Sequence, residues 1–186
     1  ITVALATGRG LFEARHIAEH IGGIRHCICM TGAELYDLKS ERTVFCRTMP
    51  NAVLASVIKA VERFPGAYCQ LYCEREIVAN EYAMNRIKEN ATAKRYLDTV
   101  RDRLITAEDV PLAVEQRGLK GAKFLIIAKE QEQLAPMKAE IAKIPGLSVV
   151  FSGSWSIEVM DESVTKGTAL KTLREMLGFE REEVLA

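Results

Sequence analysis

The chain has no net charge and no long apolar stretch. Its 25 lysines and arginines balance 25 aspartates and glutamates over 186 residues. Because a neutral chain exerts no long-range attraction on nucleic acid or anionic lipid, we expect neither as a partner. No apolar run reaches the roughly 20 residues that a membrane-spanning helix needs, and no signal peptide is evident. Apolar residues still make up 48% of the chain, which is enough for a substantial core.

Zinc-binding cysteine pairs are also missing. The five cysteines are Cys27, Cys29, Cys46, Cys69 and Cys73. Cys69 and Cys73 are separated by three residues rather than the two of a zinc knuckle, and strand alternation places both on one side. We interpret all five as reduced core thiols of a cytoplasmic protein and expect no metal site within this chain. His16 and His20, spaced four apart, are interpreted as a solvated helix face rather than as metal ligands.

The sequence pattern at each end of the chain is typical of a strand that is cut short. Ile1 opens directly into a strand pattern, and the closing residues EEVLA look like the start of another strand. A sheet cut at both sides would leave unpaired edges. The pattern therefore predicts that flanking segments belong to the same protein.

The remaining sequence divides into three parts. Residues 1–47 show a strand, a helix, a strand and a hairpin, an α/β order that predicts a helix-covered parallel sheet. Residues 48–158 predict an α+β domain whose largely antiparallel sheet has helices on one face. Its expected elements are helices over 51–63, 81–102 and 130–144, and strands over 67–73, 76–80, 123–128, 147–152 and 155–160. Residues 159–186 return to the α/β pattern with a helix that ends at Gly178, so the middle part is read as an insertion.

Thr7, Gly8 and Arg9 form the first candidate site, at the carboxyl end of the first strand. Ligands of open α/β sheets bind at this edge. Thr7 offers a hydroxyl, Gly8 lets an anion approach backbone N–H groups, and Arg9 can hold an oxyanion with two hydrogen bonds. A simple helix-capping turn with a solvated arginine is the structural alternative. The segment lacks the Gly-Lys-Ser/Thr of a phosphate-binding P-loop.

Lys166 is the second candidate, because a cation in the first turn of a helix is disfavoured by roughly 0.3–1 kcal/mol. Thr165 is placed to cap this helix, so Lys166 is not needed for the fold. A lysine followed by Gly167 at a helix N-terminus is explained if an anion binds there. A solvated lysine that tolerates the penalty explains it equally well. Trp155 is read as a half-buried strand residue, with a place in a substrate pocket as the alternative.

The segment ALATGR, followed much later by VTKGTALKTLREMLG, resembles the haloacid dehalogenase superfamily, specifically its Cof-type sugar phosphatases. In that family the second core motif is a Thr or Ser that ends a strand, and the third motif is a Lys within a similar helical segment. The family's strand followed by NGA has a counterpart here in CICMTGAELYD, and its cap is inserted between the same two motifs. The resemblance covers nearly the whole chain and implies a Rossmann-like core with an inserted α+β cap that selects the substrate.

The resemblance implies magnesium-dependent hydrolysis of small phosphorylated metabolites, such as sugar phosphates, through an aspartyl-phosphate intermediate. By analogy Thr7 and the backbone near Gly8 would bind a phosphoryl oxygen. Arg9 would contact the substrate, and Lys166 would neutralise the charge that develops during the reaction. Gly167 and the pair Thr31-Gly32 would lie beside them. Thr31 departs from the family's usual Asn, which leaves open the contact inferred for that position.

Two motifs of the family are missing from this chain: the DxD that supplies the nucleophile and the acid/base, and the GD...ND that binds magnesium. The chain alone is therefore expected to be inactive, with the nucleophile and most magnesium ligands outside it. A phosphosugar mutase and a non-catalytic phospholigand-binding module remain alternatives. Either a monomer or a homodimer is compatible with the sequence.

Overall fold

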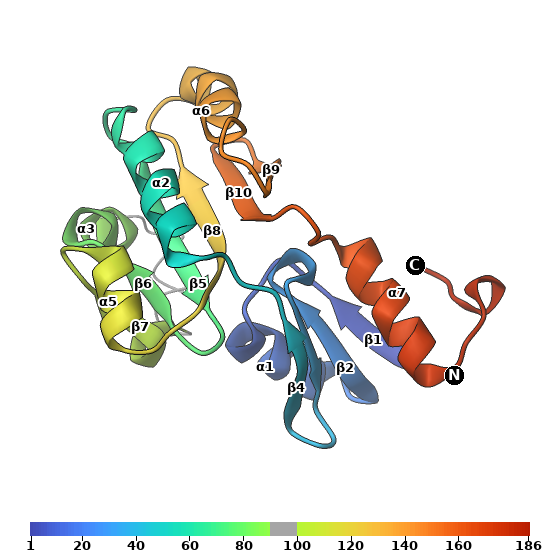
Figure 1. The fold of residues 1–186 in the computed structure, drawn as a ribbon. Coiled ribbons are helices and arrows are strands. Elements are labelled where there is room, and N and C mark those ends of the chain that lie inside the picture. Colours follow the sequence, from blue (N-terminus) through green and yellow to red (C-terminus); the bar gives the residue numbers. More distant parts are fainter. Residues whose placement is uncertain (90–99) are drawn as a thin grey trace. The chain divides into compact units, whose positions relative to one another are not determined.

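A computed structural model describes residues 1–89 and 100–186 of the chain (Figure 1). The described residues fall into two compact units. Unit 1 comprises residues 1–47 and 163–186, and unit 2 comprises residues 48–162. Unit 2 extends past the predicted boundary at residue 158 because its last strand continues to Asp161.

Unit 1 contains a four-stranded sheet in the order β1-β2-β3-β4. Its elements are β1 (Val3–Ala6), α1 (Leu11–Ile21), β2 (Ile24–Cys29), the 3-10 turn η1 (Met30–Gly32), β3 (Glu34–Asp37), β4 (Arg42–Cys46), α7 (Lys166–Leu177) and the 3-10 turn η4 (Arg181–Glu183). Strands β1 and β2 pair in parallel, as a β-α-β unit requires, whereas β3 and β4 add as an antiparallel hairpin. The fold is therefore α/β with a mixed sheet.

Helix α7 covers this sheet for reasons visible in its sequence. Thr165 caps its N-terminus by accepting a hydrogen bond from the Thr168 N–H at 2.9 Å. Gly178 ends the helix in the left-handed conformation that glycine adopts freely. Ala169 and Leu173 share one face and pack on Ile28 and Leu35 of the sheet. The predicted helix, its cap and its end are confirmed.

The chain's last residues differ from the prediction of a strand. Glu180 and Glu183 instead close the turn η4, in which the Glu183 carboxylate accepts a hydrogen bond from the Glu180 N–H at 2.8 Å. The acidic residues of this segment thus satisfy local backbone groups, and Val184 to Ala186 form no strand.

Unit 2 contains a six-stranded sheet in the order β7-β6-β5-β8-β10-β9. Its elements are α2 (Asn51–Glu62), β5 (Tyr68–Cys73), β6 (Ile77–Ala79), α3 (Glu81–Glu89), η2 (Arg101–Arg103), β7 (Leu104–Thr106), α5 (Val110–Gln116), β8 (Gly121–Ile127), η3 (Gln131–Gln133), α6 (Leu134–Ile141), β9 (Leu147–Gly153) and β10 (Ser156–Asp161). The pairs are antiparallel except β6 with β7. The predicted α+β character with a largely antiparallel sheet is confirmed.

Helices cover both faces of the unit 2 sheet, which corrects the expectation of one covered face. Helices α2, α5 and α6 pack on the face that carries Leu71, Phe124 and Ile157. Helix α3 packs with Ala79 and Tyr68, whose side chains alternate to the opposite face. The predicted helix over 81–102 is described only to Glu89, and residues 90–99 lie outside the described part of the chain.

The face opposite α2 carries a buried charged pair. The Lys123 ammonium lies 2.9 Å from the Glu158 carboxylate, and both side chains are nearly inaccessible to solvent. The same ammonium lies 4.7 Å from the centre of the Tyr72 ring. Strand register pairs Lys123 on β8 with Tyr72 on β5, and Glu158 on β10 is a diagonal neighbour of Lys123 because it pairs two residues further along β8.

No helix in the described ranges is long and apolar enough to span a membrane. None of the five cysteines, all of which lie in the described ranges, forms a disulfide. Burial raises the pKa of the Cys69 and Cys73 thiols to about 12, which keeps both groups as neutral thiols.

Candidate functional site

The loop after β1 is held in place by backbone hydrogen bonds. The Thr7 N–H donates to the Ile28 carbonyl at 2.8 Å, and the Arg9 carbonyl accepts from the Met30 N–H at 2.8 Å. Ile28 lies near the end of β2, and Met30 directly follows that strand. The loop therefore has a defined position at the carboxyl edge of the parallel pair, where the sequence predicts an anion site.

The Thr7 hydroxyl is oriented by its own loop. Its oxygen accepts a hydrogen bond from the Arg9 N–H at 3.2 Å. A hydroxyl that accepts in this way keeps its hydrogen for donation to another group. Thr7 and Gly8 are half-buried, and Arg9 is exposed. The hydroxyl and the guanidinium are thus available to a ligand at the surface of unit 1.

The turn η1 has an unusual backbone. Met30 and Thr31 have φ angles of 48° and 61°, and Gly32 follows at 110°. A positive φ is costly for a β-branched residue such as Thr31. The Thr31 N–H donates to the Thr7 carbonyl at 3.0 Å, which fastens the turn to the β1 loop.

Gly32 brings this turn against the start of α7. A Cβ atom built on Gly32 would lie 2.2 Å from the Thr165 carbonyl oxygen and 2.8 Å from the Lys166 nitrogen. Any residue other than glycine would collide with backbone atoms that cannot rotate away. The missing side chain therefore permits the close approach of η1 to α7.

The first turn of α7 presents backbone N–H groups as well as a cation. The cap from Thr165 satisfies the Thr168 N–H, and the N–H groups of Lys166 and Gly167 have no intrahelical acceptor because they begin the helix. Lys166 and Gly167 are exposed. A helix N-terminus with a lysine at its first position favours a bound anion.

The structure thus brings together the backbones of Thr7, Thr31, Gly32 and Lys166. One hydrogen bond and one close contact connect them, which sets an upper limit of roughly 16 Å between the Cα atoms of Thr7 and Lys166. Residues more than 150 positions apart in sequence are therefore neighbours at one edge of unit 1. Each predicted site residue lies in one of these segments.

Arg47 is a candidate that the sequence reasoning missed. It lines a cavity of about 300 Å³ in unit 1, together with Gly32, Ser163 and Thr168. Its N–H donates to the Ala33 carbonyl at 2.7 Å, next to η1. The available signal was a basic residue placed directly after the hairpin predicted within residues 1–47. Arg47 adds a third exposed cation to this side of unit 1.

The described residues do not fit a magnesium site. Within residues 1–89 and 100–186, no group of three or more His, Cys, Asp or Glu side chains is placed to hold a metal ion. His16 and His20 are exposed on α1, in agreement with their interpretation as a solvated face.

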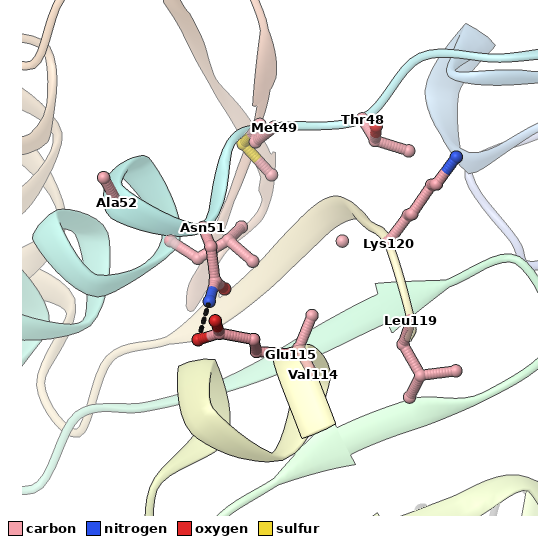
Figure 2. Close-up of a pocket in the computed structure, with 10 residues that line it drawn as sticks. Thr48, Met49, Asn51, Ala52, Val114, Glu115, Leu119 and Lys120 are labelled. Atoms are coloured by element: carbon pink, nitrogen blue, oxygen red, sulfur yellow. Dashed lines mark hydrogen bonds between the residues drawn. The ribbon is translucent and has the colours of Figure 1, made fainter. Parts of the chain in front are cut away.

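A cavity of about 590 Å³ opens in unit 2 at the start of α2 (Figure 2). The Asn51 amide donates to the Pro111 carbonyl at 3.2 Å and to the Glu115 carboxylate at 3.4 Å. Figure 2 shows Lys120 on another side of the cavity. The carboxylate among the lining groups makes this cavity less suited to a phosphate than the edge of unit 1.

Comparison with known proteins places the chain in one family. The model of the haloacid dehalogenase-like hydrolases matches residues 1–186. A Mycoplasma genitalium protein provisionally named a phosphatase is 21% identical over 188 residues, which cover 100% of this chain and 67% of that protein.

Solved structures share the fold. A haloacid dehalogenase-like hydrolase from B. subtilis has a TM-score of 0.83 at 18% identity. The match covers 98% of this chain and 69% of the B. subtilis chain. The subclass IIB sugar phosphatase BT4131 has a TM-score of 0.72 at 17% identity, and the match covers 98% of this chain and 65% of the BT4131 chain. Together with the family model, these likenesses confirm the family and the fold class that the sequence motifs predict. The chain belongs to the haloacid dehalogenase-like hydrolases.

Proposed function

We propose that the chain is part of a phosphatase that hydrolyses small phosphorylated metabolites, such as sugar phosphates. The observation that carries the proposal is the shared edge formed by Thr7, the turn Thr31-Gly32 and the start of α7. Family membership and the names of the relatives support the same chemistry. In the overall reaction water replaces the alcohol on phosphorus and yields the free alcohol and inorganic phosphate.

The residues of unit 1 have distinct roles in this proposal. The Thr7 hydroxyl donates to one phosphoryl oxygen, because its own oxygen already accepts from Arg9. The Lys166 ammonium and the first N–H groups of α7 stabilise the negative charge that spreads over the phosphoryl oxygens in the transition state. Arg9 and Arg47, both exposed, contact the substrate's phosphate or its polar body.

The nucleophile and the metal are assigned to groups outside this chain. Magnesium dependence is proposed from the family alone, since the described residues offer no cluster of ligands. Unit 2 is proposed as the substrate-selecting cap. The cytoplasm is proposed as the place of action, because none of the five cysteines in the described ranges forms a disulfide. The substrate is a small molecule, and the protein acts as a monomer or homodimer.

Phosphate binding to the chain itself tests the anion site. Titration calorimetry with inorganic phosphate is expected to show binding that Thr7→Val and Lys166→Ala weaken. Lys171→Ala is the matched control, because Lys171 is an exposed lysine further along the same helix. Equal affinity in Lys166→Ala and Lys171→Ala would contradict the proposed site.

Turnover is tested with the protein as its gene encodes it. Phosphate release from a panel of sugar phosphates is expected to need magnesium, to stop with a chelator and to fall at least about 100-fold in Lys166→Ala. Release that is indifferent to chelator or to Lys166→Ala would refute the mechanism. Phosphate binding without release from any substrate would instead favour a phospholigand-binding module.

A further inference from the structure

A cavity of about 530 Å³ lies at one end of the unit 2 sheet. Four chain segments meet there: the start of β5 at Tyr68, the end of α3, the segment after β8 at Lys129, and the β9–β10 turn at Trp155. Strand register pairs Tyr68 with Ile127 and Ile127 with Ser156, so these segments are neighbours. Trp155 thus lies in a turn rather than in the predicted strand, and it lines a pocket.

The position of Lys129 is defined by its surroundings. Its N–H donates to the Gln133 side chain at 3.0 Å, and the Gln133 amide donates to the Pro65 carbonyl at 3.1 Å. A Cβ on Gly66, whose φ is +80°, would lie 2.5 Å from the Lys129 Cδ atom. The lysine stem therefore packs against the backbone of Gly66, and Lys129 lines the cavity.

Two aromatic side chains form another part of the wall. The Trp155 carbonyl accepts from the Ala128 N–H at 2.9 Å, which anchors the turn, while the indole stays 49% exposed. The Tyr68 ring packs edge-on against Tyr82, with 6.5 Å between ring centres. A half-exposed indole on a fixed backbone offers a surface on which a flat ring can stack.

The charge of the cavity favours an anion. Lys129 has no acidic partner within the described ranges. Arg86 pairs with Glu89 at 3.0 Å, but both side chains are largely exposed, so the pair is weak and an incoming anion can compete for Arg86. Two cations and one carboxylate leave a net positive lining.

We propose that this cavity binds a small molecule that combines a flat aromatic ring with an anionic group, of the nucleoside monophosphate type. The ring stacks on Trp155 and contacts Tyr68, and the anionic group binds Lys129 and Arg86. The volume lies within the range of small-molecule sites. The proposal concerns unit 2 alone and is independent of the function proposed for unit 1.

Trp155 is the chain's single tryptophan, so its fluorescence reports on this cavity alone. Adenosine 5′-monophosphate, adenosine and inorganic phosphate are titrated separately, without divalent cation so that no turnover occurs. The monophosphate is expected to change the emission saturably and to bind more tightly than either adenosine or phosphate. No saturable change with the monophosphate, or equal affinity for adenosine, would overturn the proposal.

Three substitutions test the assigned contacts. Lys129→Met keeps the stem and removes the charge, and it is expected to weaken monophosphate binding about tenfold. Glu89→Gln is expected to tighten binding by about two- to fivefold, because it frees Arg86 and removes a repelling charge. Lys59→Met, at an exposed lysine of α2, is the control and should leave binding unchanged. Equal affinity in Lys129→Met and Lys59→Met, or weaker binding in Glu89→Gln, would refute the contacts.

Discussion

Gly32→Ala is the sharpest test of how unit 1 assembles its site. The new methyl group would lie 2.2 Å from the Thr165 carbonyl oxygen and 2.4 Å from its carbon. Real Cβ atoms do not approach backbone this closely, so η1 and the start of α7 must separate. The substitution therefore perturbs the link between Thr31 and Lys166 without removing any polar group.

Two costs add up in this variant. The φ of 110° is unfavourable for alanine and costs about 1–2 kcal/mol. Forcing a methyl group into a filled space costs about a further 1–3 kcal/mol. We expect a loss of about 2–5 kcal/mol in the stability of unit 1, together with weaker phosphate binding.

Gly178→Ala is the matched control. Gly178 also has a positive φ, of 72°, but a Cβ there would meet no atom within 4 Å. It therefore carries the backbone cost alone, about 1–2 kcal/mol. Hydrogen exchange of α7 and β2 peptides measures unit 1 separately from unit 2. If Gly32→Ala is no more destabilising than Gly178→Ala, or binds phosphate normally, the close approach does not organise the site.

Three further substitutions test individual residues. Thr31→Asn is expected to raise the free energy of unfolding by about 0.5–1 kcal/mol, since asparagine tolerates the left-handed backbone; an unchanged urea midpoint would contradict this. Burial lowers the pKa of His26, and the nearby Asp37 carboxylate opposes this shift only in part. The unfolded chain therefore binds a proton at His26 more readily than the folded chain does. Stability should be full above pH of about 6.5 and fall below it, and His26→Phe should reduce the drop in urea midpoint between neutral and acidic pH. Lys123→Met should cost about 3–5 kcal/mol because it leaves the Glu158 carboxylate buried without its cation, and adding Glu158→Leu should restore most of the stability in thermal unfolding.

Local signals in the sequence were sufficient for α7 and its surroundings. Thr165 indicates the start of that helix because it can cap it, and Gly178 indicates its end because glycine adopts the left-handed conformation. The apolar residues between them recur with the helical period and face the core. The anomaly at Lys166 was visible for the same reason, because the cap was already provided by another residue. Motif order then joined Lys166 to Thr7 across the chain.

Long-range effects were not accessible in the same way. The left-handed backbone at Met30 and the contact of Gly32 with Thr165 depend on the packing of η1 against α7, which no local pattern encodes. The short strand β7 has only three residues and pairs in parallel with β6, so its sequence is too short to show a clear alternation of apolar and polar residues. Helix α5 was overlooked although Asp109 caps it by accepting from the Leu112 N–H at 2.9 Å.

Costs to folding are concentrated where the site is proposed. Met30 and Thr31 are two of the three non-glycine residues with positive φ in the described part of the chain. Gly32 is needed for the contact beside them, and Lys166 places a cation against a helix N-terminus. A fold selected for stability alone would replace Thr31 and Lys166 with ordinary substitutions, since Thr31 is only half-buried and Lys166 is exposed. A dianion bound at the proposed site would offset the cationic penalty at Lys166, and the strained turn holds the start of α7 beside Thr7, so the proposed ligand binding accounts for these features together.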